Sequence, residues 1–208
     1  MPRRVDHDVR RREIIEALWR ITVRGGLGAA TFRQVAAEAG VSVSLVQYYF
    51  GTKADLLHAA NRAIGELVAA RVVRRLAKVG FDADPQQLVR AAVHELLPFD
   101  RRSREAILLF YAFYTAQMTD PALARAETRN TPDALITFFA NQIRRAQAAG
   151  TARDEIDPEL EAGLLTAALP GLASNAILNF YAKAEVLRSA DYAVDRIFST
   201  SRTKRRRG

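Results

Sequence analysis

The sequence contains no cysteine, and this absence excludes several kinds of chemistry. Without thiols the chain cannot form disulfides, use a thiolate nucleophile or hold zinc through cysteine. Its three histidines, His7, His58 and His94, are not spaced as metal ligands usually are. We therefore expect neither a metal site nor a cofactor.

Other signatures are missing as well. There is no run of eighteen uninterrupted apolar residues and no charged-then-apolar leader, so we expect a cytoplasmic protein without a membrane span or secretory signal. The sequence also lacks a glycine-rich phosphate loop, a nucleophile elbow and a histidine–carboxylate pair at a readable spacing. We accordingly predict that the protein is not an enzyme.

Apolar residues make up 49% of the sequence, which is enough to bury a core. The net charge is +8, and it is unevenly distributed along the chain. Residues 1–60 carry nine basic and six acidic side chains, residues 61–200 carry seventeen of each, and residues 201–208 carry five basic ones. Basic ends on a neutral middle are typical of nucleic-acid-binding proteins. The basic tail is alternatively only a solvated end, and in both cases we predict that it is disordered.

Apolar residues recur at spacings of three and four along almost the whole chain, which predicts an all-α fold. Capping residues followed by proline mark helix starts, and glycines mark helix ends. The expected helices span about residues 8–24, 31–39, 43–50, 52–79, 85–97, 101–118, 121–149, 158–181 and 184–199. Their lengths indicate a small N-terminal domain over residues 1–52 and a larger domain over residues 53–200.

The most informative stretch is residues 31–50. Thr31 and Gln34 have the spacing of a capping box, and Gly40 is placed to end the short helix with a sharp turn. Ser42 can then cap a second short helix. This order is that of a helix-turn-helix, whose second helix enters the major groove of DNA.

The outward face of the second helix supplies the predicted base contacts. Gln47 is the best candidate base reader, because a glutamine can form two hydrogen bonds with adenine, and Val43 can contact a thymine methyl group. Tyr48 and Tyr49 are alternatively core aromatics, although consecutive helix residues cannot both face one core. The predicted DNA-binding residues, including those expected to contact phosphates, are Thr31, Arg33, Ser42, Val43, Ser44, Gln47, Tyr48, Tyr49 and Lys53.

The stretch from Thr31 to Leu57, with its Ala-Glu-Ala-Gly-Val-Ser and Tyr-Tyr-Phe segments, resembles the DNA-binding domain of TetR-family transcriptional regulators. The resemblance implies a homodimer, expected to be a repressor, that binds an inverted-repeat operator and is released by a small-molecule effector. Gln47 stands where the family often has tyrosine, and Ser44 where it often has glycine. These departures affect the operator sequence rather than the DNA-binding role.

The larger domain carries aromatic residues all round one helix, from Leu109 to Met118. Such a helix is buried against other helices or around a cavity. The family resemblance implies an apolar ligand pocket in this domain, and a weaker similarity near Gly171 is to the family's choline-responsive branch. The neutral charge of the middle of the chain and its aromatic helices favour an apolar effector, or a cation that stacks on aromatic rings, over a polyanion. The candidate lining residues are Phe110, Phe113, Tyr114, Gln117, Phe138, Asn175 and Asn179, each of which is alternatively a core residue.

The last two expected helices, at about 158–181 and 184–199, are the predicted dimer interface, again by the family resemblance. Asn175 and Asn179 are expected on one helix face, where they either bind a ligand or pair across the dimer. The remaining alternative function is a DNA-compacting protein that works through its basic ends. Such a protein would show little sequence preference and a steep dependence on salt.

Overall fold

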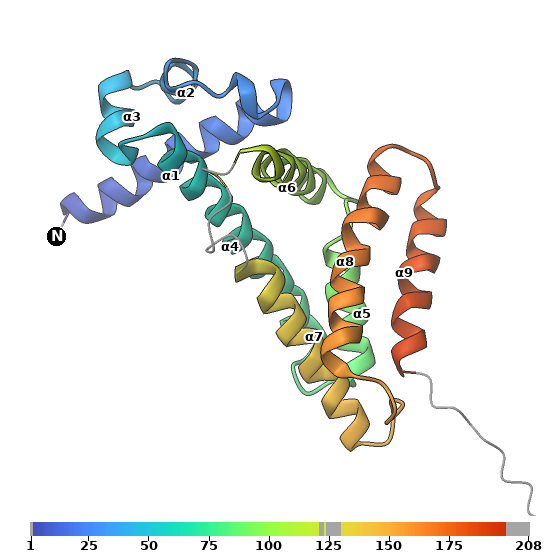
Figure 1. The fold of residues 1–208 in the computed structure, drawn as a ribbon. Helices are drawn as coiled ribbons and strands as arrows, with labels where there is room; N and C mark the ends of the chain where they lie inside the picture. The colour runs from blue at the N-terminus through green and yellow to red at the C-terminus, as the bar shows by residue number, and fades with distance from the viewer. Residues whose placement is uncertain (1, 121–122, 124–129, 199–208) are drawn as a thin grey trace, which may run out of the picture. The chain divides into compact units, whose positions relative to one another are not determined.

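A computed structural model describes residues 2–120, 123 and 130–198, and these residues form nine α-helices and no strand. The helices are α1 (Pro2–Gly25), α2 (Phe32–Ala39), α3 (Val43–Phe50), α4 (Lys53–Val79), α5 (Pro85–Glu95), α6 (Arg101–Thr119), α7 (Asn130–Ala148), α8 (Pro158–Ile177) and α9 (Lys183–Phe198) (Figure 1). A short 3-10 helix, η1 (Leu27–Ala29), joins α1 to α2. The predicted all-α fold is confirmed.

Several helices begin where the sequence places a capping residue. The side chain of Asp84 accepts hydrogen bonds from the first backbone N–H groups of α5, and Asp157 does the same for α8, with a proline directly after each. The basic tail over residues 201–208 lies outside the described residues. So do residues 121–122 and 124–129, within the helix predicted from residue 121. Leu123 is in a turn and α7 begins at Asn130, so the predicted start of this helix was too early.

The chain divides into two compact units, each with its own core. The first comprises residues 1–68 and 105–128, and therefore contains all of the predicted N-terminal domain. Its core joins α1–α3 to the first part of α4 and to most of α6. The largest buried contributions come from Ile14, Leu18, Val35, Val46, Leu56, Leu109 and Phe113.

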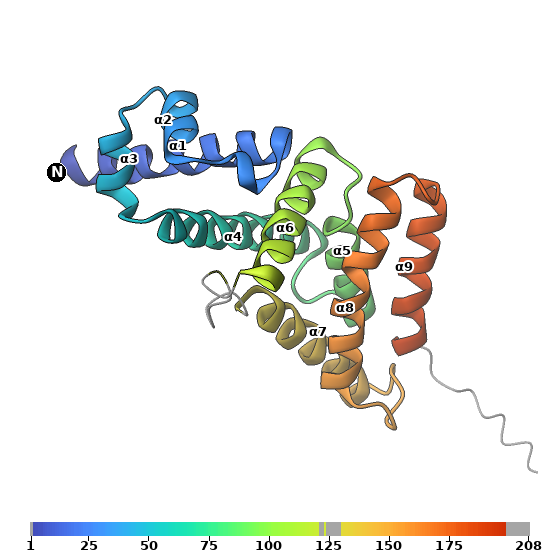
Figure 2. The same ribbon diagram turned by 45° about the horizontal axis from the view of Figure 1, so that its top comes forward.

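The second unit comprises residues 69–104 and 129–208. Its core is built from the C-terminal part of α4 together with α5, α7, α8 and α9, and Figure 2 shows α8 and α9 running side by side. Large side chains that are almost completely buried here include Leu88, Val93, Leu97, Phe139, Ile143, Val194 and Ile197.

Candidate nucleic-acid interface

The turn between α2 and α3 is built by local hydrogen bonds that fix where each helix begins and ends. The Thr31 hydroxyl accepts a hydrogen bond from the Gln34 backbone N–H at 3.2 Å, and the Gln34 side chain returns to Thr31, which completes the predicted capping box. Gly40 has a φ of 67° and ends α2 in the left-handed conformation. Ser42 caps α3 through the Leu45 N–H at 3.1 Å.

The inner face of α3 anchors it to the rest of the first unit. Val46 and Phe50 are buried in the core that includes Ile14 and Ala36, and Leu45 is half-buried. Since one side of this two-turn helix is fixed in this way, its opposite side is held outward as a rigid surface.

The outer face of α3 carries the residues predicted to read bases. Val43, Ser44 and Gln47 are exposed, and the Tyr48 side chain is 74% exposed. A helix with small and hydrogen-bonding side chains on its free face can approach base edges closely in the major groove. Tyr49 is half-buried, because its ring lies against the core beside Phe50.

The predicted phosphate contacts are Thr31, Ser42, Tyr49 and Lys53. Thr31, Ser42 and Lys53 are exposed at the starts of α2, α3 and α4, whereas Tyr49 is half-buried. Arg33, which was predicted to bind DNA without a more specific role, is exposed in the first turn of α2. The hydroxyls of Thr31 and Ser42 accept backbone hydrogen bonds, and the Ser42 hydroxyl keeps its proton available for a phosphate oxygen. The structure thus brings all the predicted DNA-binding residues together within the first unit.

Two residues of α1 that the sequence analysis did not single out also reach α3. The centroid of the His7 ring lies 4.4 Å from that of Tyr49, and Arg11 donates a hydrogen bond to the Tyr49 carbonyl at 3.3 Å. The Arg11 guanidinium also lies 4.7 Å from the centroid of the Phe50 ring. The sequence feature that could have indicated this contact is the excess of basic residues near the N-terminus.

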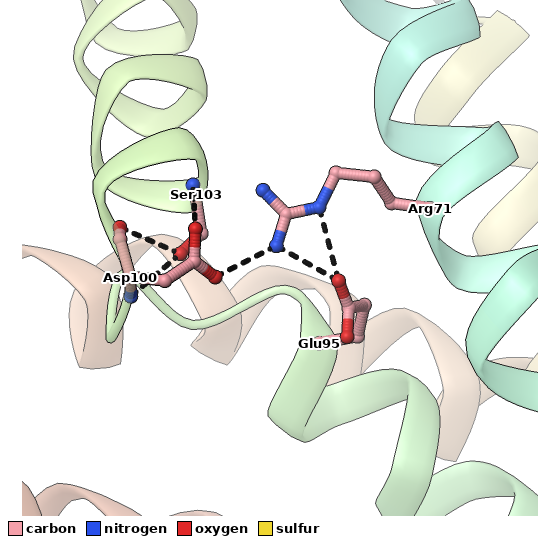
Figure 3. Close-up of polar contacts among 4 residues, drawn as sticks. All are labelled: Arg71, Glu95, Asp100 and Ser103. Carbon is pink, nitrogen blue, oxygen red and sulfur yellow. Dashed lines mark hydrogen bonds and ion pairs between the residues drawn. The ribbon is translucent and has the colours of Figure 1, made fainter.

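In the second unit, Arg71 of α4 is bound to the connection between α5 and α6 (Figure 3). Its guanidinium donates to the carboxylate of Glu95 at 2.8 and 3.0 Å and to that of Asp100 at 3.0 Å. Asp100 caps α6, because its carboxylate accepts the Ser103 backbone N–H at 2.9 Å. This hydrogen bond, with those from the Ser103 hydroxyl and Arg71, lowers the pKa of Asp100 to about 2.

The residues predicted to line an effector pocket fall in both units. Phe113 is only 2% exposed and belongs to the core of the first unit, whereas the Phe110 and Tyr114 rings stack on each other with centroids 5.5 Å apart. Tyr114 is half exposed and Gln117 is half-buried. Phe138 is half-buried at the edge of the second core. Their role in binding an effector stays a prediction.

Asn175 and Asn179 do not share a helix face, and that expectation was wrong. α8 ends at Ile177, and Asn179 has a φ of 56°, in the left-handed region that asparagine tolerates better than most residues. The Phe180 N–H donates to the Asn175 carbonyl at 3.0 Å, which closes the last turn. Asn175 is therefore half-buried at the end of α8, and Asn179 is exposed in the turn that follows.

Two families of known proteins match most of the chain. Residues 85–199 match the family described as "BetI-type transcriptional repressor, C-terminal", and residues 14–60 match "Bacterial regulatory proteins, tetR family". The regulator BetI of Paraburkholderia phymatum is 33% identical over 150 residues, which cover 70% of this chain and 75% of BetI. The regulator PksA of Bacillus subtilis is 28% identical over 181 residues, covering 86% and 84% of the two chains.

Solved structures show the same fold. A transcriptional regulator from Rhodococcus sp. Rha1 matches with a TM-score of 0.77 and 28% identity over 90% of this chain and 95% of its own. A regulator from Saccharomonospora viridis, solved in complex with choline, matches with a TM-score of 0.79 and 24% identity, covering 91% and 98% of the two chains.

Proposed function

Because this chain belongs to the TetR family of bacterial transcriptional regulators, with a C-terminal part of the BetI type, we propose that it is a ligand-responsive repressor. It binds an inverted-repeat operator as a homodimer and is released by a small molecule. The observation that carries this proposal is the outward face of α3, where Val43, Ser44, Gln47 and Tyr48 are exposed on a helix whose other side is fixed in a core.

Within this function, Gln47 and Val43 read bases, while Lys53, Arg33 and the Ser42 hydroxyl contact phosphates. The Thr31 hydroxyl donates to the Gln34 side chain at 2.9 Å, so Thr31 acts by fixing the start of α2 beside the phosphates. Phosphate contacts fix where the protein sits on the duplex, and contacts with base edges select the sequence. Lys53 is suited to the first task because it is exposed at the first turn of α4, directly after the turn that follows α3.

Homodimerisation through α8 and α9 is supported by the apolar residues that α8 leaves uncovered. Leu160 and Leu164 are 68% and 63% exposed, and the small residues Ala167, Ala168 and Gly171 on the same helix let a second helix approach closely. Tyr192 adds an exposed ring on α9. A second copy of the chain, presenting the same helices, would cover both faces.

The exposed leucines also bear on localisation. By length and composition α8 is apolar enough to cross a membrane, and it is the one such helix in the part of the chain that the structure describes. A single helix of this kind is weak support for a membrane protein. Burial of α8 in a dimer accounts for its composition in a cytoplasmic regulator that must reach DNA.

The effector we propose is a small cation with apolar substituents, such as a quaternary ammonium compound. The stacked rings of Phe110 and Tyr114, with Tyr111 packed edge-on against Phe110, give α6 an aromatic surface of the kind that binds such cations. The match to BetI-type repressors, and the choline bound to the regulator from Saccharomonospora viridis, support the same class of ligand.

Selection from a pool of random DNA duplexes tests the proposed function. We expect the chain to enrich an inverted repeat whose half-sites lie about 34–36 Å, or one helical turn, apart, with two chains bound per duplex. Enrichment of no sequence, together with a steep fall of affinity with salt, would instead identify a sequence-independent DNA-compacting protein.

A further inference from the structure

One face of α1 changes its chemistry along the helix. Ile14, Leu18 and Ile21 recur at helical spacing and are buried in the core of the first unit. Toward the N-terminus the same face continues with Arg11, which is half-buried, and His7, which is exposed. The apolar stripe thus becomes a polar and basic one where the core ends.

This basic part of α1 lies against the C-terminal end of α3. The His7 ring centroid is 4.4 Å from that of Tyr49 and 6.2 Å from that of the exposed Tyr48, and Arg11 is bound to the Tyr49 carbonyl. From His7 the helix continues to Pro2, about 8 Å farther at 1.5 Å per residue. The first turns of α1 therefore extend past the end of the helix that reads DNA.

The charges of this segment are not spread evenly around the helix. At about 100° per residue, Arg10 and Arg11 lie within about 60° of the direction of His7, whereas Arg12 lies about 140° away. Asp8, about 100° away, is off this face. The side turned toward α3 therefore carries Arg10 and Arg11, and Arg10 also forms an exposed ion pair with Glu13 at 2.6 Å.

We propose that this face of α1, defined by His7, Arg10 and Arg11, is a second DNA-contacting surface that binds phosphates at the edge of the groove entered by α3. The inference rests on the proposed reading role of α3. The major groove is about 12 Å wide, so a side chain beside the end of a helix in that groove meets its phosphate wall. Contacts of this kind add affinity for any sequence and a dependence on salt, but no base preference.

The test compares two arginines of the same helix. Arg10→Ala should weaken binding to the selected operator and to an unrelated duplex by the same factor, about three- to fivefold at low salt, and reduce the slope of log affinity against log salt by about 0.9. Arg12→Ala removes the same charge from the opposite side and should change neither quantity. Arg10→Lys keeps the charge and should retain most of the slope.

Thermal unfolding midpoints of the three variants verify that each is folded. The proposal for α1 would be overturned if the wild-type chain selects an operator but Arg10→Ala and Arg12→Ala change DNA affinity and its salt dependence equally. It would also be overturned if neither variant changes them. A wild-type chain that selects no operator would instead overturn the proposed function, so the two failures are distinguishable.

Discussion

In the proposed function, single residues in α3 and at its borders have separate roles in recognising DNA. Gln47 is exposed on the outer face of α3 and contributes nothing to the buried core, whereas Val46, its neighbour in sequence, is fully buried. Substitutions at exposed positions away from a cap or a core change stability by about 0.5 kcal/mol or less. The DNA-binding role of Gln47 can therefore be tested without unfolding the domain.

Gln47→Ala is expected to relax or shift the preferred operator, with a loss of about 1–3 kcal/mol of operator affinity, because it removes hydrogen bonds to a base edge. Site selection with the variant measures this. Lys53→Ala is the matched control, since it should weaken binding to all duplexes alike and reduce the salt slope by about one. An unchanged preferred site in Gln47→Ala would mean that the glutamine does not face the bases.

The turn between α2 and α3 depends on the backbone freedom of one glycine. Gly40 has a φ of 67°, and a Cβ atom added there would meet no atom within 4 Å, so a substitution brings backbone strain without a clash. Gly40→Ala should lower the free energy of unfolding by about 1 kcal/mol. Gly28→Ala is the control, because its Cβ also has open space but its φ is not positive. Urea denaturation that showed equal stability for both would contradict this account.

At the scale of elements, the start of α6 is held by a network whose strength depends on pH. Asp100 combines the cap of α6 with the ion pair to Arg71, and together these interactions hold its pKa at about 2, compared with an ordinary value of 3.8. Since the folded-state pKa is the lower one, the network stabilises the fold fully above pH 4. That contribution is lost as the pH falls from about 4 to about 2.

Asp100→Asn tests this contribution, because asparagine is a comparable helix cap but carries no charge. Asp100 is more than half exposed, so after allowance for solvent screening we expect a loss of about 1 kcal/mol at pH 7 and a shallower loss of stability between pH 4 and pH 2. Asp82→Asn, at an exposed position between α4 and α5, is the control. Identical acid-denaturation profiles for Asp100→Asn and the wild type would show that the charge of Asp100 does not stabilise the fold.

The proposed dimer is also a property of elements, namely α8 and α9. Leu164→Glu places a charge on the exposed apolar side of α8 and should convert the dimer to a monomer at micromolar concentration, which sedimentation velocity would detect. Val73→Glu places the same charge at another exposed apolar position, on α4, and should leave the dimer intact. A dimeric Leu164→Glu variant would place the interface elsewhere.

What could be predicted from the sequence was mostly what local interactions determine. The capping box of Thr31 and Gln34 and the turn at Gly40 involve neighbours a few residues apart, so their pattern is visible in the sequence. The contact of His7 with Tyr49 joins positions 42 residues apart, and no local pattern encodes it. The end of α8 was misplaced because the apolar residues continue past Ile177, although the backbone leaves the helix there.

The effector site likewise depends on contacts between distant residues, which a local sequence pattern does not show. The aromatic residues of α6 predicted that much of this helix is buried, and Phe113 is indeed in a core. Whether a half-exposed ring such as that of Tyr114 lines a pocket or only covers a core depends on which segments pack beside it. That is set by contacts between distant parts of the chain, so the sequence pattern left both interpretations open.

At the scale of the whole molecule, two helices connect the units without a break. α4 contributes residues 53–68 to the first unit and residues 69–79 to the second, and α6 is likewise divided, between residues 101–104 and 105–119. Because an α-helix is stiff, a displacement at one end of α4 reaches the other end. For the proposed dimer we therefore expect that a ligand bound near these helices changes the spacing of the two recognition helices without contacting DNA.

The proposed coupling between effector binding and operator binding must be reciprocal, and choline is the probe with which to measure it. If choline weakens operator binding by some factor, saturation with operator must weaken choline binding by the same factor, because both follow from one coupling free energy. Titration of the full-length protein with choline, with and without operator DNA, gives both factors. Betaine, which has a carboxylate where choline has a hydroxymethyl group, is the matched control ligand. If choline bound tightly but left operator affinity unchanged, the mechanism would be contradicted. A ligand with equal affinity for two states does not shift the equilibrium between them.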